Sequence, residues 1–347
     1  MKLDDLVAQT GEWLRGGGPK EQIVLSSRVR LARNLAGIPF PNWGDKEQRA
    51  DGLRRVLQAV ARSKFLKGSL VLEMASLSEL DRQFLVERHL ISRELASGSD
   101  QSAVVVSDRE VISLMINEED HLRLQVLQSG LNLREAWAVL SRVNEELEAV
   151  LHYAFTPEWG YLTTCPTNVG TGMRASCMLH LPCLVMTRQI NRVLHAISKL
   201  GLTARGLYGE GTDAIGNFFQ LSNQVTLGVS EEETLDTLER LIGQVVEQEE
   251  AARRALFAQS REAVEDRIWR AYGTLKTAHL VNSTEATNLL STVRLGVDMG
   301  VLPDLPREKV NRLFIQTQPA HLQKLEGREL SAPERDSRRA KLLRESL

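Results

Sequence analysis

The sequence predicts an α+β fold, with an antiparallel sheet flanked by helices over residues about 20–255 and an all-helical domain after it. Three observations lead to this prediction. In IVLSSRVRLARNL, Arg28 and Arg30 alternate with apolar residues at the period of a strand. The runs AVVV and VISLMI flank a short polar turn at 107–110, as in a β-hairpin. From Ser230 onward, helical periodicity continues to the end of the chain.

The 347 residues are enough for two domains. We expect an N-terminal arm at 1–22, a catalytic domain at 23–255 and a helical domain at 256–347. With 42% hydrophobic and 25% charged residues and no apolar run of about 18, the composition excludes a membrane span. The N-terminus has no signal-peptide core, so we expect a cytoplasmic protein. With a net charge of −2, the chain lacks the overall positive charge that would attract it to nucleic acid.

The first helices are expected at 45–68 and 76–98, where apolar residues recur at helical spacing. His89 lies within the second and is either a surface group or a ligand contact. The hairpin strand VISLMI then runs into Asn-Glu-Glu-Asp-His at 117–121. Successive acids after a buried strand repel one another unless a cation or a substrate guanidinium lies among them. A plain acidic turn remains the alternative.

A long helix follows, and Asn132 with Glu135 three residues on predicts a capping box at its start. The stretch 161–184 combines a thiol, glycines and Arg174, a composition suited to a tight loop that approaches an anion. The three cysteines, at 165, 177 and 183, fit neither a disulfide framework nor a zinc site, so reduced thiols are expected. A helix from about Pro182 to Leu200 comes next.

Residues 201–227 read as a strand, a glycine-punctuated flexible loop and a hairpin. Glycines in such a loop favour a segment that closes over bound ligand. Ser230 with Glu233 begins a helix through about residue 270, whose length predicts a bridge between domains. The last helix, capped by Ser331 and Glu334, carries Arg335 and Arg339 one turn apart, a fork for a phosphate or a solvated charged face.

Five stretches together resemble the signatures of the phosphagen (guanidino) kinases. In chain order they are SSRVRLAR at 26–33, VISLMINEEDHLR at 111–123, CPTNVGTGMRA at 165–175, RGLYGEGTD at 205–213 and NFFQLSN at 217–223. Within that superfamily the whole chain looks like the bacterial protein-arginine kinase (McsB) family. The resemblance implies a phosphagen-kinase or glutamine-synthetase-like sheet and transfer of a phosphoryl group from ATP, with Mg²⁺, to a guanidine nitrogen.

The resemblance also implies roles for individual residues. The catalytic residues would be Glu119, Glu210 and Cys165, with Glu119 as the base and Cys165 as an electrostatic contact. ATP would be bound by Ser27, Arg28, Arg30, His89, Arg123, Arg174, Ser176 and Arg205. RDSRRA matches the family's phosphoarginine-binding motif, which implies an allosteric site at Arg335, Asp336 and Arg339. No metal-ligating residues are expected, since the nucleotide and water would hold the Mg²⁺.

The short segment before the strand that contains Arg28 bears on the size of the substrate. Small-molecule phosphagen kinases have about a hundred residues of helical domain there, whereas this chain has some twenty-five. An open site would suit an arginine displayed on a protein. The family further implies tagging of proteins for a Clp-type protease, inactivation of a stress-gene repressor, a zinc-binding activator protein and a homodimer.

Three alternatives stay open. The chain could phosphorylate free arginine or another small guanidino compound. It could be a non-catalytic adaptor that binds phosphoarginine, although intact Glu119, Glu210 and the five arginines argue against a degenerate site. A carboxylate–amine ligase would need several carboxylate metal ligands, and the sequence offers such a cluster only at 117–120.

Overall fold

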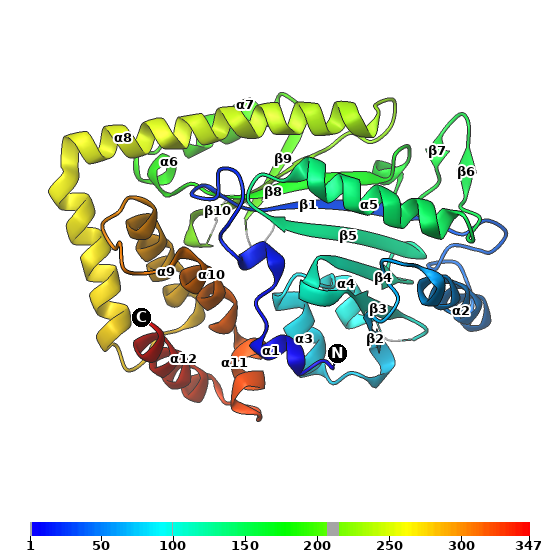
Figure 1. The fold of residues 1–347 in the computed structure, drawn as a ribbon, viewed down its shortest axis with the longest axis horizontal. Helices are drawn as coiled ribbons and strands as arrows, with labels where there is room; N and C mark the ends of the chain where they lie inside the picture. Colours follow the sequence, from blue (N-terminus) through cyan, green and yellow to red (C-terminus); the bar gives the residue numbers. More distant parts are fainter. Residues whose placement is uncertain (1, 99, 207–214) are drawn as a thin grey trace.

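A computed structural model describes residues 2–98, 100–206 and 215–347. In this part of the chain, eight strands form one antiparallel sheet in the order β2-β3-β4-β5-β1-β8-β10-β9 (Figure 1). Its strands are β1 (Val24–Arg33), β2 (Leu70–Glu73), β3 (Ala103–Val106), β4 (Ile112–Ile116), β5 (Leu122–Ser129), β8 (Met173–His180), β9 (Leu202–Gly206) and β10 (Phe218–Asn223). A separate ribbon pairs β6 (Phe155–Thr156) with β7 (Gly160–Tyr161). The predicted α+β class is confirmed.

Two long helices cover the apolar face of the sheet. They are α5 (Leu133–Glu148) and the first half of α8 (Glu231–Thr277). Val29 and Leu31 of β1 are fully buried in the main core, where Leu140 of α5 and Leu238 of α8 pack with them. From Ser27 onward, the odd-numbered residues of β1 therefore face this core, and the even-numbered residues face the other side of the sheet.

The helix α8 bends at Ser260, where φ is −147° and ψ is 43°, and it then leads into the C-terminal helices (Figure 1). These are α9 (Ser283–Asp298), α10 (Arg307–Gln316), α11 (Pro319–Glu326) and α12 (Ala332–Ser346). The capping boxes predicted at Ser230 and Ser331 are both confirmed. A second core joins these helices to Trp13, Met178 and Phe218, so the C-terminal region packs directly on the sheet and the N-terminal arm.

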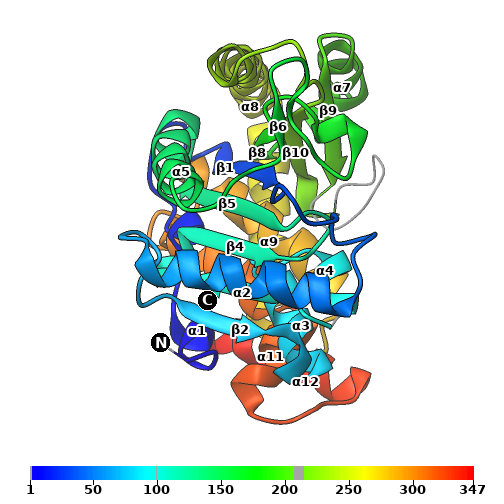
Figure 2. The ribbon, with the colours of Figure 1, turned by 90° about the vertical axis from the view of Figure 1, so that its right-hand side faces the viewer.

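The remaining helices border the sheet. In the view of Figure 2, α2 crosses the front, and α11 and α12 lie at the opposite end of the molecule from α7. The α-helices are α1 (Asp5–Ala8), α2 (Lys46–Arg62), α3 (Glu79–Glu87), α4 (Arg93–Ser97), α6 (Pro182–Met186) and α7 (Ile190–Ser198). The 3-10 helices are η1 (Glu12–Leu14), η2 (Met74–Ser76), η3 (Asp108–Glu110), η4 (Pro166–Asn168) and η5 (Ile215–Asn217).

Both early helix predictions were too long. The helix expected over 45–68 ends at Arg62, and the chain forms β2 by residue 70. The segment 76–98 is split into α3 and α4 because His89 adopts a left-handed φ of 59° and Ser92 caps a new helix. A helix cannot continue through a left-handed residue. The helix expected over 182–200 divides for the same reason at Arg188, where φ is 58°.

Two further predictions were wrong in detail, and one strand was not predicted. The stretch 161–184 is not all loop, because β8 occupies residues 173–180 within it. The segment after the acidic turn is a strand, β5, before the long helix begins. The capping box at Asn132 is absent, since its side-chain amide donates to Ser129 O at 2.7 Å instead of accepting a helix N–H.

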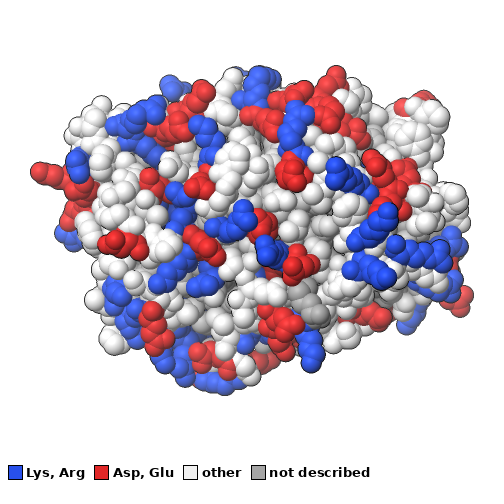
Figure 3. Space-filling view, in the orientation of Figure 1, with Lys and Arg blue, Asp and Glu red and all other residues white. Residues whose placement is uncertain are grey.

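The face seen in Figure 3 carries basic and acidic side chains interspersed, in keeping with the small net charge of −2. Across the described residues, every helix is too short or too polar to span a bilayer.

Candidate active site

One face of the sheet brings together polar side chains from neighbouring strands. In the register of the sheet, Arg30 of β1 lies opposite Arg174 of β8. On the next pair of strands, Gln220 of β10 lies opposite Arg205 of β9. Arg28 is two residues from Arg30 and therefore points the same way. The predicted pairing of Arg28 and Arg30 on one strand face is confirmed, and β5, β8, β9 and β10 widen it into a basic surface.

A cavity of about 1040 Å³ opens on this face. Sequence-predicted residues that line it are Arg28, Arg30, His89, Glu119, Arg123 and Arg205. Other polar residues in its wall were not predicted, namely Arg49, Ser92, Arg93, Glu94, Asp100, Asn117, Glu118 and Gln220. The wall is thus rich in cationic side chains, with a few carboxylates near the turn after β4.

A smaller cavity of about 220 Å³ adjoins the first. Arg30, Glu119, Arg123 and Arg205 line both, so the two spaces share a wall. The smaller cavity adds Cys165 and Arg174, along with Thr167, Asn168 and Gly172. The loop before β8, residues 162–172, is called the signature loop below. Glu119 therefore lies where the two cavities meet, and Cys165 lines the smaller of the two.

The arginine cluster consists of Arg28, Arg30, Arg123, Arg174 and Arg205, which are partly buried except for the exposed Arg205. Burial, followed by repulsion from Arg123 and Arg174, lowers the pKa of Arg28 to about 10. Burial and the neighbouring guanidinium groups also lower the pKa of Arg30 and of Arg174. The Nε of Arg30 is buried and has no hydrogen-bond partner among the described residues. A cluster of like charges in this state is stabilised by a bound anion.

Glu118 partly offsets this charge, and the sequence analysis assigned it no role. Its Oε1 accepts hydrogen bonds from Arg123 Nη1 and Ser92 Oγ, each at 2.6 Å, and its Oε2 accepts from Glu119 N at 3.0 Å. Burial opposes ionisation, but Arg123 and these hydrogen bonds outweigh it and lower the pKa of Glu118. The same pair raises the pKa of Arg123 against its burial. The acidic run at 117–121 was the sequence feature from which a role for Glu118 could have been predicted.

Glu119 lies between the two cavities. Burial raises the pKa of its carboxyl, and the neighbouring charges of Asp120 and Glu118 raise it further. Asp120 is itself buried, and its Oδ1 accepts from Asn34 Nδ2 at 2.6 Å and from Thr164 N at 2.7 Å. A carboxylate with a raised pKa in a cleft is suited to accept a proton.

Asp120 also explains how Cys165 reaches this position. Thr164 donates its hydroxyl to Glu119 O at 2.9 Å, while its N–H is held by Asp120, so the signature loop is tied to the acidic turn at two points. Cys165 is half-buried, and its Sγ lies 3.0 Å from Thr167 Oγ1. The sequence did not identify Asp120 as the residue that joins the two motifs.

His89 and Ser176 lie at the other end of the site, where they line a cavity of about 20 Å³ with Arg28 and Gln220. Burial, and then the charge of Arg28, lowers the pKa of His89 to about 3, so the imidazole is neutral at neutral pH. Gln220 Oε1 accepts from Arg28 Nη2 at 2.9 Å. A neutral imidazole beside an arginine cluster can contact the nucleotide without adding charge.

Ser27 does not reach this site. It is fully buried on the opposite face of β1, where its Oγ donates to Gly130 O at 2.8 Å and accepts from Asn132 N at 2.9 Å. The alternation that places Arg28 and Arg30 on one face puts Ser27 on the other. Its assignment to ATP binding therefore lacks geometric support.

The remaining predicted residues lie elsewhere. Glu210 falls outside the described residues. Arg335, Asp336 and Arg339 are on α12, away from the sheet (Figure 1). Arg339 is buried, and it donates to Thr317 O at 2.7 Å, to Val281 O at 2.8 Å and to Asp336 Oδ1 at 2.6 Å. These contacts join α12 to its neighbours.

A bound Mg²⁺ was expected to be held by nucleotide and water. Among the described residues, no group of three or more His, Cys, Asp or Glu side chains is placed to hold a metal ion. Glu118, whose side chain is 2% exposed, is committed to Arg123 and Ser92, and the buried Asp120 is committed to Asn34 and Thr164. The donor set therefore fits a metal carried on phosphate oxygens rather than a metal held by the protein.

Comparison with known proteins gives two family matches. Residues 53–252 match the family described as ATP:guanido phosphotransferase, C-terminal catalytic domain. Residues 261–347 match the protein-arginine kinase McsB C-terminal domain. The interval between the matches contains the bend of α8 at Ser260.

Curated relatives match over the whole chain. A protein-arginine kinase of Desulforamulus reducens is 51% identical over 100% of this chain and 98% of its own length. One from Symbiobacterium thermophilum is 50% identical over 100% and 99%. Among solved structures, a lombricine kinase gives a TM-score of 0.60 at 24% identity, covering 73% of this chain and 72% of that one. At that identity the likeness concerns the fold alone.

Proposed function

The chain belongs to the protein-arginine kinase family, and from this premise we propose that it transfers the terminal phosphoryl group of ATP to arginine side chains of proteins. The observation that carries the proposal is the wall shared by the two cavities. There the arginine cluster adjoins Glu119, and Cys165 lies just beyond. An anion site with the carboxylate of Glu119 at its edge fits a triphosphate that meets a guanidinium.

The larger cavity takes the nucleotide in this proposal. Phosphoryl transfer passes through a loose transition state with charge spread over the phosphoryl oxygens, so positioning and charge neutralisation supply most of the catalysis. The guanidinium groups that would bind the phosphates are those of Arg28, Arg30, Arg123, Arg174 and Arg205. Mg²⁺, when bound with the nucleotide, would offset further charge on the phosphate oxygens.

The smaller cavity takes the acceptor guanidinium. Glu119 accepts hydrogen bonds from it and orients one nitrogen toward the terminal phosphorus. As the P–N bond forms, the bond between that phosphorus and the bridging oxygen breaks, ADP leaves, and the proton lost by the guanidinium passes to Glu119. Cys165 adds an electrostatic contact, and no covalent intermediate on it is needed. Glu210 is the second carboxylate that we propose for the same cation.

The test is phosphosite mapping after incubation with ATP and an unfolded arginine-rich protein, under neutral handling because P–N bonds hydrolyse in acid. We expect phosphoarginine on the protein and little product from free arginine offered in parallel. Product from free arginine alone would assign the chain to the small-molecule kinases instead.

A matched pair of variants connects the activity to this site. Glu119→Gln should lower kcat by about 10²- to 10⁴-fold because it removes the proton acceptor. Glu145→Gln removes a carboxylate from the exposed face of α5 and should keep the parent rate. Full turnover by the Glu119 variant would favour the adaptor alternative.

The resemblance supports further proposals about the cellular role. Phosphorylated proteins would be passed to a Clp-type protease, a stress-gene repressor would be inactivated, and a zinc-binding protein would activate the kinase, in the cytoplasm. The C-terminal region, about 256–347, would form the homodimer. Arg335, Asp336 and Arg339 would bind phosphoarginine, a proposal supported by the motif RDSRRA.

A further inference from the structure

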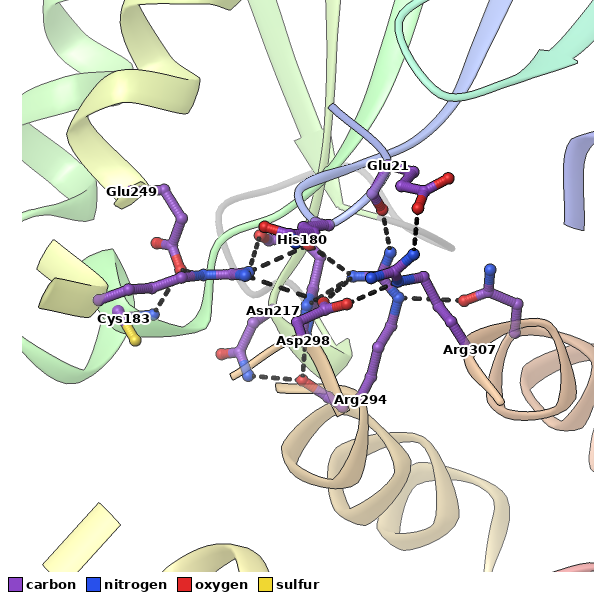
Figure 4. Close-up of polar contacts among 12 residues, drawn as sticks. Glu21, His180, Cys183, Asn217, Glu249, Arg294, Asp298 and Arg307 are labelled. Carbon is purple, nitrogen blue, oxygen red and sulfur yellow. Dashed lines mark hydrogen bonds and ion pairs between the residues drawn. The ribbon is translucent and has the colours of Figure 1, made fainter. Parts of the chain in front are cut away.

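The helix α9 lines neither of the two cavities, but it forms hydrogen bonds to the end of the sheet next to them. Asn288 Oδ1 accepts a hydrogen bond from Gly216 N at 2.9 Å. Ser291 Oγ lies 3.0 Å from Asn217 Nδ2 and 2.8 Å from His180 Nε2. Figure 4 shows His180 and Asn217 directed toward one point on this helix, with Arg294 approaching His180 from the other side. Three side chains of the C-terminal region, those of Asn288, Ser291 and Arg294, thus reach η5 and the end of β8.

The hydrogen-bond roles at His180 follow from its neighbours. Arg294 Nη1 lies 3.0 Å from Nδ1, and a guanidinium can only donate, so Nδ1 accepts. The ring is neutral, since burial and the charges of Arg294 and Arg253 lower its pKa. The remaining proton is therefore on Nε2, which donates to Ser291 Oγ. Arg294 is fixed in turn by further acceptors, Glu21 O, Gln22 O, Asn311 Oδ1 and Asp298 Oδ2.

The turn held by α9 has an unfavourable backbone. Gly216 has φ 70° and Asn217 has φ 58°, so two successive residues are left-handed. Such a turn persists where its surroundings fix it. A Cβ at residue 216 would lie 2.8 Å from Thr287 Cγ2, which shows how closely α9 packs on this turn.

The turn leads directly into residues that support the arginine cluster. β10 begins at Phe218, opposite His180 of β8. Two residues later Gln220 accepts from Arg28 at 2.9 Å, and Ser222 Oγ accepts from Arg174 Nη2 at 3.2 Å. A shift at the start of β10 would therefore move the partners of two arginines on the basic surface.

We propose that Asn288 and Ser291 are positioning residues for ATP binding, which fix the η5 turn and the adjoining ends of β8 and β10. Through this turn they hold Gln220 and Ser222 against Arg28 and Arg174. The proposal rests on the proposed function, because it assumes that this cluster binds the phosphates. In this proposal the C-terminal region supports the nucleotide site through α9, and this support does not depend on a ligand bound at α12.

The test compares three variants of α9 by direct measurement of ATP affinity and by steady-state kinetics. Asn288 is exposed, so Asn288→Ala should fold normally and should raise the Kd of ATP about fivefold, the effect of one lost hydrogen bond. Asn288→Asp keeps an acceptor for Gly216 N and should restore the parent value. Thr292→Ala removes a hydroxyl that donates to Asn288 O within the same helix, and this variant should bind ATP as the parent does.

If Asn288 had a purely structural role, the variants would lose stability, but their Kd values for ATP would not differ from one another. Parent affinity in Asn288→Ala, or equal loss in Asn288→Asp or Thr292→Ala, would overturn the proposal. Ser291→Ala, checked for folding by urea titration, should also weaken ATP binding, with KM for ATP rising more than kcat falls. Because ATP binding is measured without an acceptor, a parent protein that binds ATP but phosphorylates no protein would refute the proposed function and not this inference.

Discussion

The carboxylate of Glu118 is buried between Arg123 and Ser92 and bonds to both. Replacing it by glutamine keeps the shape but leaves Arg123 charged beside Arg28 and Arg30. Loss of one partner of a buried ion pair costs about 3–5 kcal/mol. We therefore predict that Glu118→Gln lowers the free energy of unfolding by about 3 kcal/mol in urea titration at pH 7.5. The control is Glu145→Gln, and a loss no larger than in that control would contradict the prediction.

The raised pKa of Glu119 gives a second prediction. A base works only when ionised, so the acid limb of the pH profile of kcat/KM should lie above the ordinary glutamate pKa of 4.5. Asp120→Asn removes one of the charges that raise this pKa and keeps an acceptor for Asn34 and Thr164. We predict that the limb moves to lower pH in this variant. The exposed Asp108→Asn should leave it in place, and an unchanged limb in Asp120→Asn would argue against Glu119 as the base.

At the scale of elements, the signature loop depends on glycine where it meets β1. Gly172 has φ 63°, and a Cβ there would lie 2.6 Å from Arg33 Nη1 and 2.7 Å from Ala32 O. Gly327, at the end of α11, has a similar φ of 66°, but no atom of the described residues lies within 4 Å of its Cβ position. We predict that Gly172→Ala lowers the unfolding free energy by at least about 2 kcal/mol, because it adds a clash to the cost of the backbone conformation.

The matched control is Gly327→Ala, which isolates the backbone cost and should lose only about 1 kcal/mol. Both variants are compared by urea titration. Since Cys165 is on the same loop, Gly172→Ala should also lower kcat, whereas Gly327→Ala should not. Equal losses of stability in the two variants would show that the contact with β1 is unimportant.

For the whole molecule, four histidines determine the response to acid. Burial is the largest cause in each case and lowers the pKa of His89 and His321 to about 3, that of His121 to about 4 and that of His180 further. Their folded-state pKa values lie below the unfolded value of 6.5, so the unfolded chain binds more protons as the pH falls. Their contribution to stability is full above pH 6.5 and is lost below it.

Buried carboxyls with a raised pKa act in the opposite direction, namely Glu87, Glu110 and Glu249. Glu87 accepts from Ala320 N and His321 N at the start of α11, and burial raises its pKa to about 7. The folded protein therefore takes up a proton there before the unfolded chain does, which adds stability as the pH falls from 7 toward 4.5. Between pH 7.5 and 5.5, the contribution of each histidine to the free energy of unfolding falls by up to about 1.4 kcal/mol. The loss from the four histidines together is therefore larger than the gain from Glu87.

We predict that the unfolding free energy falls between pH 7.5 and 5.5 and that Glu87→Gln makes the fall steeper, because one opposing carboxyl is gone. The measurement is urea titration at several pH values, with the exposed Glu79→Gln of α3 as the control. A shallower fall in the Glu87 variant would mean that its carboxyl is ionised throughout this range.

Several features of the molecule were predictable from local pattern. The period of two in β1 identified a strand with Arg28 and Arg30 on one face, and the same period would have placed Ser27 on the other. The hairpin of β3 and β4 and the capping boxes at Ser230 and Ser331 also depend on residues close in sequence. The residue types of the site were evident for the same reason, since the acidic turn and the glycine-containing loop are short, continuous segments.

The sequence by itself determined which segments alternate between buried and polar faces, and hence the class of fold and the chemistry available to it. Only the tertiary structure decided where helices stop at left-handed residues such as His89, which carboxylate neutralises Arg123, and that Asn288 of a distant helix holds the turn before β10. The physical reason is that periodicity records the side on which a residue is buried. Hydrogen-bond and ion-pair partners are chosen between segments far apart in the chain, once the sheet register is set.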